Sequence, residues 1–496
     1  MDTTPLPIFG PALGALLLIS AMPATRGEDG RPASAPSAAA APLGPSRDEY
    51  RARRRALMDR VERAEAGSGA LRAAMLRAGS GPEPSPGAAG VVIVLVGEGE
   101  QAEDAKFHQD NDFAYLSGVD VPHSALILRP ESGEEALYLP PRDRSMDRWV
   151  GPRIGPGKDA AESTGFARVE STASFLADLF RAVGDPRTGG HSPAATVYLV
   201  EPSPKPDSTT PAARLARLVR EGAPGGRYKD VAPLVHEMRK TKSDAEADLI
   251  RRAVAVTGDA QREVIRAIRP GVPEYRLEGA ILGAFVAGGA SRAGFPSIVG
   301  SGPNSTVLHY GRNSRTIEDG DLVVVDIGAE VRDYTADITR TYPANGRFTP
   351  RQRDVYKLVL DGQRAAEADF KPGVSTISSL TRAVRDVFRA SPLRAKDEDG
   401  VEQSMDHFFT HGLGHHMGLD VHDVGDSTRP LNPGEVFTIE PGLYLAGEAL
   451  GVRIEDDYRV TKDGLEKLSK DIPSDPDEVE RLIGAARGGI PASPAR

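Results

Sequence analysis

Cysteine is absent from the 496-residue chain. Its absence excludes disulfides, thiolate metal sites and a cysteine nucleophile, so any bound metal must be held by oxygen and imidazole ligands. Nothing follows for the cellular compartment, because an exported protein with a large core does not need disulfides.

Two further absences restrict the function. No apolar run of about eighteen residues follows the N-terminal region, so the body of the chain is expected to contain no membrane span. The net charge of −10 lacks the basic excess that is typical of a nucleic-acid-binding protein. The content of 39% hydrophobic and 27% charged residues is ordinary for a soluble globular protein, and the length predicts two domains plus tails.

Residues 1–45 are expected to lie outside the folded domains. Leu13–Ala21 is an apolar run with the length of a signal-peptide core, and residues 31–45 form a linker rich in proline, alanine and serine. This pattern predicts export to the periplasm or the exterior. The segment before the run carries Asp2 and no basic residue. A disordered extension of a cytoplasmic protein, or a misplaced start, is therefore the alternative.

Two domains of different character are predicted to follow. Residues 46–235 alternate β-type and helical runs, which indicates an α/β domain; it opens with a basic helix after Ser46 whose arginines are expected on a solvated face. Residues 236–490 place helices around hairpins, which indicates an α+β catalytic domain. Its first helix begins at a capping box formed by Ser243 and Glu246. The expected strands are Leu322–Gly328, Tyr334–Tyr342, Glu435–Leu445 and Gly451–Val460.

Four acidic residues lie on or beside these strands. Asp326 closes a run of leucine and valine, and Asp337 lies eleven residues later, a spacing that fits neighbouring strands joined by a turn at Gly328–Arg332. A carboxylate buried among aliphatic residues is costly unless it is paired or binds a metal. A capping or salt-bridged aspartate is the simpler interpretation of one such residue, and a metal site competes with it for two.

The glutamates repeat this pattern. Glu440 ends an alternating run before Pro441, and Glu455 lies in the following strand with Arg453 two residues away on the same face. Taken alone, Glu455 is explained by an ion pair with Arg453, and Glu440 by a turn.

Five of the ten histidines lie in sixteen residues, at His407, His411, His415, His416 and His422. The glycines among them make a regular helix improbable and let the backbone approach a ligand closely. A histidine-rich polar surface loop is the alternative.

Together, four carboxylates and one imidazole favour a metal site. Four negative charges in one place oppose ionisation, and two divalent cations would neutralise them. The oxygen-rich set suits manganese or another hard to borderline ion better than structural zinc. Two metals about 3.5–4 Å apart can share a hydroxide that attacks a carbonyl.

The sequence resembles the pita-bread metallopeptidases, in particular aminopeptidase P and prolidase. The resemblance rests on five motifs in the family's order: SIVGSGPNSTVLHY, VVVDIGAEVRDYTADITRTY, HGLGHHMGLDVHDVG, TIEPGLY and VRIEDD. The segments DFAYLSGVDVPHSALIL and DRWVGPRIGPGKDAAESTGF resemble the family's N-terminal domain. The implied fold is a pita-bread catalytic domain preceded by a creatinase/prolidase-type α/β domain.

The resemblance implies Xaa-Pro aminopeptidase activity, which removes the residue in front of a proline. It implies two divalent metal ions as cofactors, for which Mn²⁺ is the expected metal. It also implies a homo-oligomer that acts on peptides with proline in second position, with no nucleic-acid partner. Asp326 would bind one metal, His415 and Glu440 the other, and Asp337 and Glu455 both. His309 and His422 would position the scissile carbonyl and stabilise the oxyanion, and His411 would help line the pocket. Glu440 would also carry a proton, and Arg453 would orient a ligand carboxylate.

Three residues depart from the family's pattern. Phe295 stands where aminopeptidase P commonly has tyrosine, His416 where an aromatic residue or leucine is frequent, and Ala114 where some relatives have a large aromatic residue that closes a neighbouring subunit's site. The first two leave the ligand set intact, whereas the third leaves oligomer-dependent substrate selection open.

Prolidase, an Xaa-Pro dipeptidase, is the nearest alternative. It must recognise a free carboxylate near the metals, for which Arg292 and Arg312 are the candidate partners. Creatinase works without metals, methionine aminopeptidase lacks the large N-terminal domain, and a non-catalytic binding module would show damaged ligands. The complete ligand set and the N-terminal motifs favour aminopeptidase P over all of these.

Overall fold

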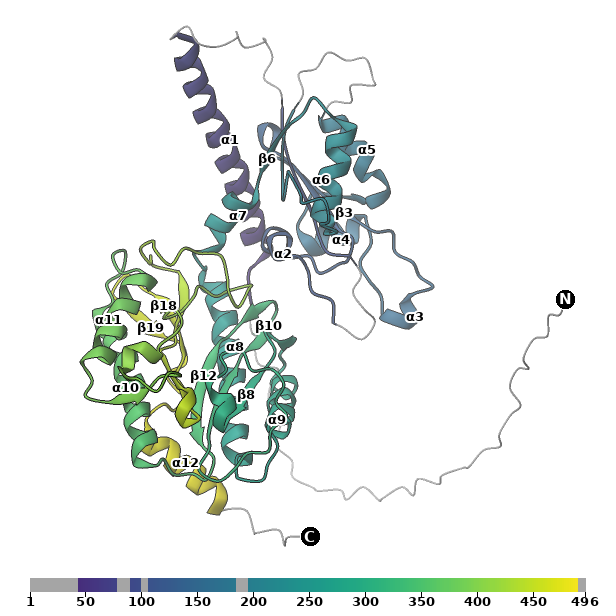
Figure 1. The fold of residues 1–496 in the computed structure, drawn as a ribbon. Coiled ribbons are helices and arrows are strands. Elements are labelled where there is room, and N and C mark those ends of the chain that lie inside the picture. The colour runs from purple at the N-terminus through teal and green to yellow at the C-terminus, as the bar shows by residue number, and fades with distance from the viewer. Residues whose placement is uncertain (1–42, 78–89, 100–105, 184–194, 489–496) are drawn as a thin grey trace, which may run out of the picture. The chain divides into compact units, whose positions relative to one another are not determined.

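The computed structural model describes residues 43–77, 90–99, 106–183 and 195–488 (Figure 1). Of these, side chains are described for all but residues 68–77. The predicted export segment, with most of the linker after it, lies outside the described residues. Within the described part of the chain, no helix has both the length and the apolar character needed to cross a membrane.

The N-terminal half is built on a six-stranded mixed sheet with the order β4-β3-β2-β1-β5-β6. Strands β1, β2 and β3 pair antiparallel, and the other neighbours are parallel. The strands are β1 (Val91–Val96), β2 (Ala125–Arg129), β3 (Glu134–Leu139), β4 (Arg168–Ser171), β5 (Thr196–Leu199) and β6 (Arg227–Asp230). The helices are α1 (Arg47–Arg77), α2 (Asn111–Ser117), α3 (Asp147–Val150), α4 (Lys158–Thr164), α5 (Thr172–Val183), α6 (Pro211–Gly222) and α7 (Ala232–Arg239).

Alternating side chains of β1 explain why helices cover both faces of this sheet. Val92 and Val94 belong to a core that includes α5 and α6, whereas Ile93 and Leu95 belong to the core that includes α1. Successive residues of a strand point to opposite faces, so a strand that is apolar at every position needs a partner on each side. The predicted α/β architecture is confirmed.

The prediction of a solvated arginine face on α1 is wrong for two arginines. Arg54 is fully buried, lies over the ring of Phe166 and donates to Glu135 at 2.8 Å. Arg53 is 6% exposed and donates to the Tyr115 carbonyl. Basic residues on one face of a helix are usually solvated, and the buried acceptors that reverse this here are distant in sequence.

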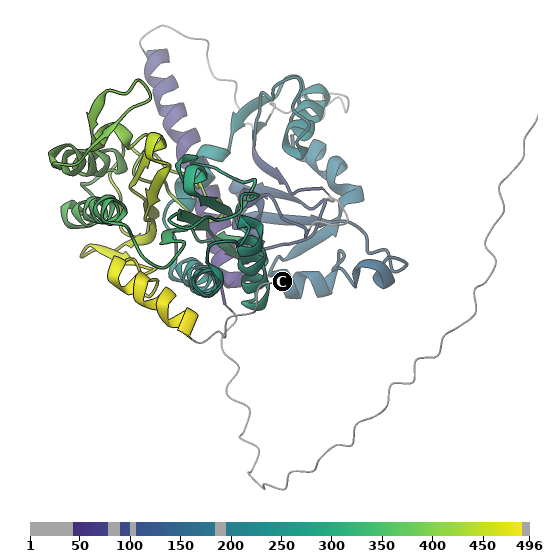
Figure 2. The same cartoon turned by 60° about the horizontal axis from the view of Figure 1, so that its bottom comes forward.

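Two pairs of helices enclose the strands of the C-terminal half (Figure 1). One pair is α8 (Asp244–Ala267) with α9 (Glu274–Ala287), and the other is α10 (Pro350–Asp369) with α11 (Ile377–Ala390). The predicted capping box of Ser243 and Glu246 begins α8. Helix α12 (Pro476–Gly488) packs against α8 and α10 (Figure 2).

The strands of this half are shorter than predicted. Its sheets are β12-β9-β8, β11-β10-β7, β15-β18-β19, β16-β17 and β13-β14. The predicted strand Tyr334–Tyr342 is divided into β11 (Tyr334–Thr335) and β12 (Ile338–Pro343). The expected turn at Gly328–Arg332 is largely occupied by β10 (Ala329–Val331), and the chain reverses at Arg332 and Asp333, which both have positive φ. The remaining strands are β7 (Arg292–Ala293), β8 (Ile298–Ser301), β9 (Leu322–Ile327), β13 (Arg394–Lys396), β14 (Glu402–Ser404), β15 (Val436–Ile439), β16 (Gly442–Leu445), β17 (Leu450–Arg453), β18 (Asp456–Val460) and β19 (Leu465–Lys467).

Two buried glutamines make equivalent contacts in the two parts of this half. Gln261 of α8 donates to the carbonyls of Val325 and Ile338, and Gln363 of α10 donates to those of Ile439 and Ile454. Each of these carbonyls belongs to a residue next to one of the four predicted acidic ligands. The two glutamines therefore fix the backbone on which the site is built.

Candidate metal centre

Three of the four acidic residues lie where one strand ends and the next begins. Asp337 lies between β11 and β12, Glu440 between β15 and β16, and Glu455 between β17 and β18; Asp326 lies inside β9. A residue at such a break is not bound to the regular alternation of a strand, so its side chain can take a direction that the alternation does not give. The breaks that the sequence did not reveal thus lie at the predicted ligands.

These breaks bring donor atoms from distant segments together. His415 Nε2 lies 3.3 Å from Asp337 Oδ2 and 3.6 Å from Glu440 Oε1. One ligand atom each from Asp337, His415 and Glu455 all lie within 4.8 Å of one another. The loop with His415 is fixed to β15, because the Thr438 amide donates to the His415 carbonyl at 2.9 Å.

Burial and mutual repulsion disfavour the ionised acids. Burial, followed by the charges of Asp326, Asp457 and Glu440, raises the pKa of Asp337 well above its ordinary range. Burial, followed by Asp337, raises the pKa of Glu455 in the same way. Burial raises the pKa of Glu440 to about 7, although His415 and Arg453 act in the opposite direction. A cluster of this kind gains stability from positive charge placed within it.

Two carboxylate oxygens identify where that charge fits. Asp326 Oδ1 and Asp337 Oδ1 are buried and accept no hydrogen bond from the described residues. Buried polar atoms in folded proteins are nearly always satisfied, and unsatisfied ones call for a ligand, ion or water. Oxygen donors with a single imidazole match hard to borderline divalent cations. The residues present therefore fit a divalent metal.

A chain of hydrogen bonds links the predicted ligand Asp326 to His411 through two other side chains. Arg453 donates to Asp326 Oδ2 at 2.7 Å and to the Tyr444 hydroxyl at 3.0 Å, and Tyr444 is 2.9 Å from His411 Nε2. The alternative explanation of Glu455, an ion pair with Arg453, does not hold, because Arg453 pairs with Asp326 and Glu455 accepts from the Thr339 hydroxyl at 2.6 Å. The break after Arg453 turns the two side chains toward different partners.

The histidines divide into two groups. The rings of His415 and His422 are 4.1 Å apart, and burial, followed by His415 and His309, lowers the pKa of His422. His416 instead forms an isolated antiparallel β-bridge with Phe437. Position 425 is glycine because a Cβ at this position would collide with the His416 ring. His407 also lies away from the predicted metal ligands, and its ring packs on Phe408. Of the five histidines in this segment, three thus lie at the site: His411, His415 and His422.

Comparisons with known proteins agree with this geometry. Residues 248–462 match the model of metallopeptidase family M24, and residues 50–188 match that of the aminopeptidase P N-terminal domain. The chain is 33% identical to Xaa-Pro aminopeptidase of Escherichia coli, over 89% of this chain and 99% of that protein. It is 32% identical to human Xaa-Pro aminopeptidase 3, over 77% of each chain. The chain belongs to the aminopeptidase P family.

A solved relative shows that the likeness extends to the fold. Zinc-substituted E. coli aminopeptidase P in complex with product has a TM-score of 0.73 and 30% identity, and the match covers 90% of this chain and 99% of that one. The predicted fold, a pita-bread domain after an aminopeptidase P N-terminal domain, is confirmed. The chain is a metal-dependent aminopeptidase of a family that uses divalent ions.

Several residues around the centre were not identified from the sequence. Tyr444 was included in a motif without a role, although it links Arg453 to His411. Gln261 and Gln363 lie on helices whose periodicity indicates only packing. Conversely, Arg292, a candidate for recognising a dipeptide carboxylate, donates to Glu330 at 2.8 Å, and Arg312 is exposed.

Metal removal is expected to make the protein less stable at high pH. Acids whose pKa is raised by folding bind protons more tightly in the folded state than in the unfolded state, where their pKa is about 4. Their contribution is fully present below about pH 4 and is lost as the pH rises through the folded-state pKa, about 7 for Glu440. After chelation, the Tm should therefore be several degrees lower at pH 8 than at pH 5. If the Tm fell equally between pH 5 and pH 8 with and without Mn²⁺, the predicted ligands would not be the acids responsible for the pH dependence.

Proposed function

We propose that this chain hydrolyses the peptide bond between an N-terminal residue and a following proline. The observation that carries the proposal is the group of four carboxylates and His415 in a chain with 33% identity to E. coli Xaa-Pro aminopeptidase; three of the carboxylates are buried, and Glu440 and His415 are partly buried. The acids come from segments more than a hundred residues apart, and hydrogen bonds orient them. Such an arrangement is costly for folding, and catalysis at a metal is the function that explains it.

Two divalent cations would be held by five residues: Asp326, Asp337, His415, Glu440 and Glu455. Of these, Asp337 and Glu455 would contribute to holding both. When bound, the cations neutralise the carboxylates, polarise the scissile carbonyl and lower the pKa of water. The oxygen-rich donor set supports Mn²⁺ as the metal. Arg453 would orient Asp326 through their 2.7 Å contact, as hydrogen-bonded partners of metal ligands commonly do.

The remaining side chains have separate proposed roles. His309 and His422 position the scissile carbonyl and stabilise the negative charge that develops on its oxygen. His411, held by Tyr444, lines the pocket. Glu440 carries a proton to the proline nitrogen, which leaves poorly unless it is protonated.

Two further features belong to this proposal. The apolar run Leu13–Ala21 supports export through a signal peptide. The resemblance to aminopeptidase P supports a homo-oligomer. The N-terminal residue and the solution mass of the purified protein test them, and an intact Met1 on a monomer would contradict both.

Peptide length and metal dependence are the decisive properties of the reaction. Chelated protein should be inactive, and added Mn²⁺ should restore cleavage of the first bond of a Gly-Pro-Ala peptide. A Gly-Ala-Ala peptide is the matched control and should remain intact. Cleavage of the dipeptide Gly-Pro alone would make the chain a prolidase, and no cleavage of either proline peptide with metal bound would refute the proposed substrate class.

A further inference from the structure

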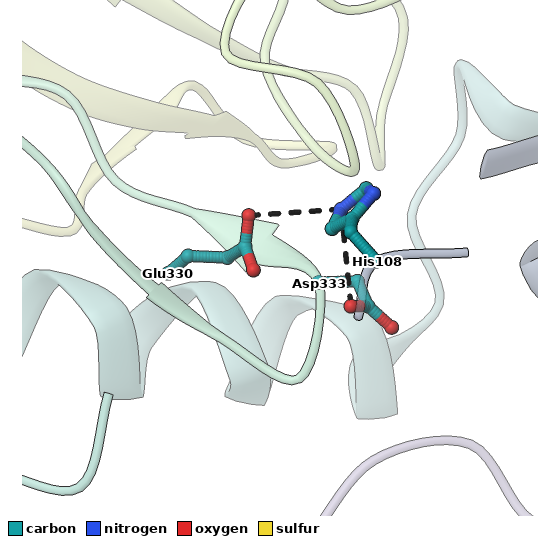
Figure 3. Close-up of side chains that lie close together, drawn as sticks. All are labelled: His108, Glu330 and Asp333. Carbon is teal, nitrogen blue, oxygen red and sulfur yellow. Dashed lines mark ion pairs between the residues drawn. The ribbon is translucent and has the colours of Figure 1, made fainter. Parts of the chain in front are cut away.

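Two groups of side chains join the segment 106–112, which precedes and opens α2, to the C-terminal half. In the first, His108 lies between Glu330 and Asp333, with Nε2 at 3.7 Å and 3.9 Å from their carboxylates (Figure 3). One donor atom from each of the three lies within 4.8 Å of the others, as in a cation site. Arg292 already donates to Glu330 at 2.8 Å, however, so positive charge is supplied there by the chain. We interpret this group as an ion-paired contact.

The second group reaches the loop that carries His422. The Asn111 amide donates to Asp420 Oδ1 at 2.8 Å, two residues before His422. Asp112 accepts from Arg239 at 2.7 Å, and Arg239 also donates to Asp420 at 2.7 Å and to Asp423 at 2.6 Å. One guanidinium therefore joins α2 to the residues on both sides of His422.

The centre of this network is buried, whereas the Asp420 side chain at its edge is 48% exposed. The side chains of Arg239 and Asp423 are 4% and 1% exposed, and Lys242, also 1% exposed, donates to Asp423 at 2.8 Å. Burial tends to raise the pKa of Asp423, but the charges of Lys242 and Arg239 keep it below its ordinary value. Charge-assisted hydrogen bonds are stronger than neutral ones and hold a more definite geometry when they are removed from water.

The backbone of the loop is held at the same points. The Asp423 amide donates to the His416 carbonyl at 2.8 Å, and the Thr335 amide donates to the Gly418 carbonyl at 3.0 Å. A Cβ at Gly418 would collide with the Asp423 carboxylate, so only glycine permits this close approach. The His422 ring projects from the fixed loop to within 4.1 Å of the His415 ring.

We propose that Asn111 and Asp112 of the N-terminal domain, acting through Arg239, Asp420 and Asp423, position His422 for catalysis. They are positioning residues, because they reach the reacting atoms only through the loop. The inference rests on the proposed function, in which His422 stabilises the charge that develops on the carbonyl oxygen. It gives the N-terminal domain a part in aligning the active centre.

Positioning of this kind acts on the transition state. A histidine whose contact with the carbonyl oxygen strengthens as negative charge develops contributes mainly to kcat, and substrate binding at the metals changes little when it is displaced. A misplacement of about 1 Å can cost about a hundredfold. Loosening the loop should therefore lower kcat while KM and metal content stay close to those of the wild type.

The test compares two variants on the same segment of the full metal-loaded chain. Asn111→Ala removes a hydrogen bond to the loop. His108→Ala, the matched control, removes the contacts with Glu330 and Asp333, which lie in the same half of the protein but outside the loop. On a proline-containing tripeptide, Asn111→Ala is expected to lower kcat about ten- to a hundredfold with KM within about twofold. His108→Ala should leave both constants within about twofold. Equal losses in the two variants would show that only domain association matters and would overturn the proposal.

A double-mutant cycle then shows whether the effect passes through His422. If it does, Asn111→Ala should cost nothing further in a His422→Ala background, because coupled residues are non-additive. A full additional loss of kcat would overturn the proposal.

Hydrogen exchange of residues 418–425 gives a readout that does not depend on activity. Exchange there should be faster in Asn111→Ala and unchanged in His108→Ala. Unaltered exchange in Asn111→Ala would refute the positioning role even if the proposed substrate class were wrong. Wild-type cleavage of the tripeptide tests that class separately.

Discussion

Asp337→Asn is expected to lower kcat by at least about a thousandfold while the protein remains folded. Asparagine has the shape of aspartate but cannot supply the charge by which one residue would hold both cations. A bound metal contributes several kcal/mol of transition-state charge stabilisation, and each 1.36 kcal/mol is a factor of ten in rate. Hydrolysis of a proline tripeptide, together with the metal content of the purified variant, measures the effect.

The same substitution should stabilise the metal-free protein. Burial and the charges of Asp326, Asp457 and Glu440 raise the pKa of Asp337, so a neutral amide at this position removes repulsion that the metal-free fold must otherwise bear. Chelated Asp337→Asn should therefore have a higher Tm than chelated wild type at pH 8.

Asp333→Asn is the matched control for this pair of effects. It lies on the same β11 hairpin, outside the cluster, with a positive φ that asparagine tolerates. It should alter neither activity nor the Tm of the chelated protein. Full activity of Asp337→Asn would refute the two-metal scheme.

The predicted metal ligands illustrate what sequence patterns can reveal. Asp326 follows an aliphatic run and Glu440 precedes Pro441, and both signals are local. The breaks that carry Asp337 and Glu455 have no such signal, because Tyr334–Tyr342 and Gly451–Val460 alternate like uninterrupted strands. Those breaks depend on tertiary partners, such as the Thr339 carbonyl that accepts from the Glu455 amide at 3.1 Å.

Contacts between distant residues were the other limit. The sequence places Arg453 two residues from Glu455 and so suggests that they pair, but its partner Asp326 lies 127 residues away. The buried arginines of α1 show the same limit, since Glu135 is 81 residues from its partner Arg54. The tertiary fold decides which polar groups pair. Sequence periodicity predicts only which face of a single helix or strand a residue lies on.

Arg340→Met is expected to destabilise the folded protein by about 3–5 kcal/mol. Arg340 is fully buried, and all five of its N–H donors are engaged. It donates to Asp456 at 2.6 Å and to the carbonyls of Thr339, Glu455, Ile472 and Pro473. Methionine fills similar space but leaves a buried carboxylate and four carbonyls without this donor. Urea unfolding measures the loss.

Arg347→Met provides the surface comparison. The side chain of Arg347 is 82% exposed and pairs with Glu480 at 3.2 Å, a contact worth about 0–1 kcal/mol in water. If Arg340→Met cost no more than Arg347→Met, the buried pair would have no special role in stability.

The paired variant Arg340→Met, Asp456→Leu separates the two components of this loss. Removing one partner of a buried ion pair leaves an uncompensated charge, whereas replacing both partners by apolar residues is often close to neutral. The double variant should therefore be more stable than Arg340→Met alone, although Lys467, which also contacts Asp456 at 2.7 Å, loses that partner. It should not recover metal affinity, because Arg340 also fixes the Glu455 carbonyl at 2.7 Å and hence the direction of a proposed ligand. A double variant with restored stability but weakened metal binding would show that this arginine orients the centre as well as holding the fold together.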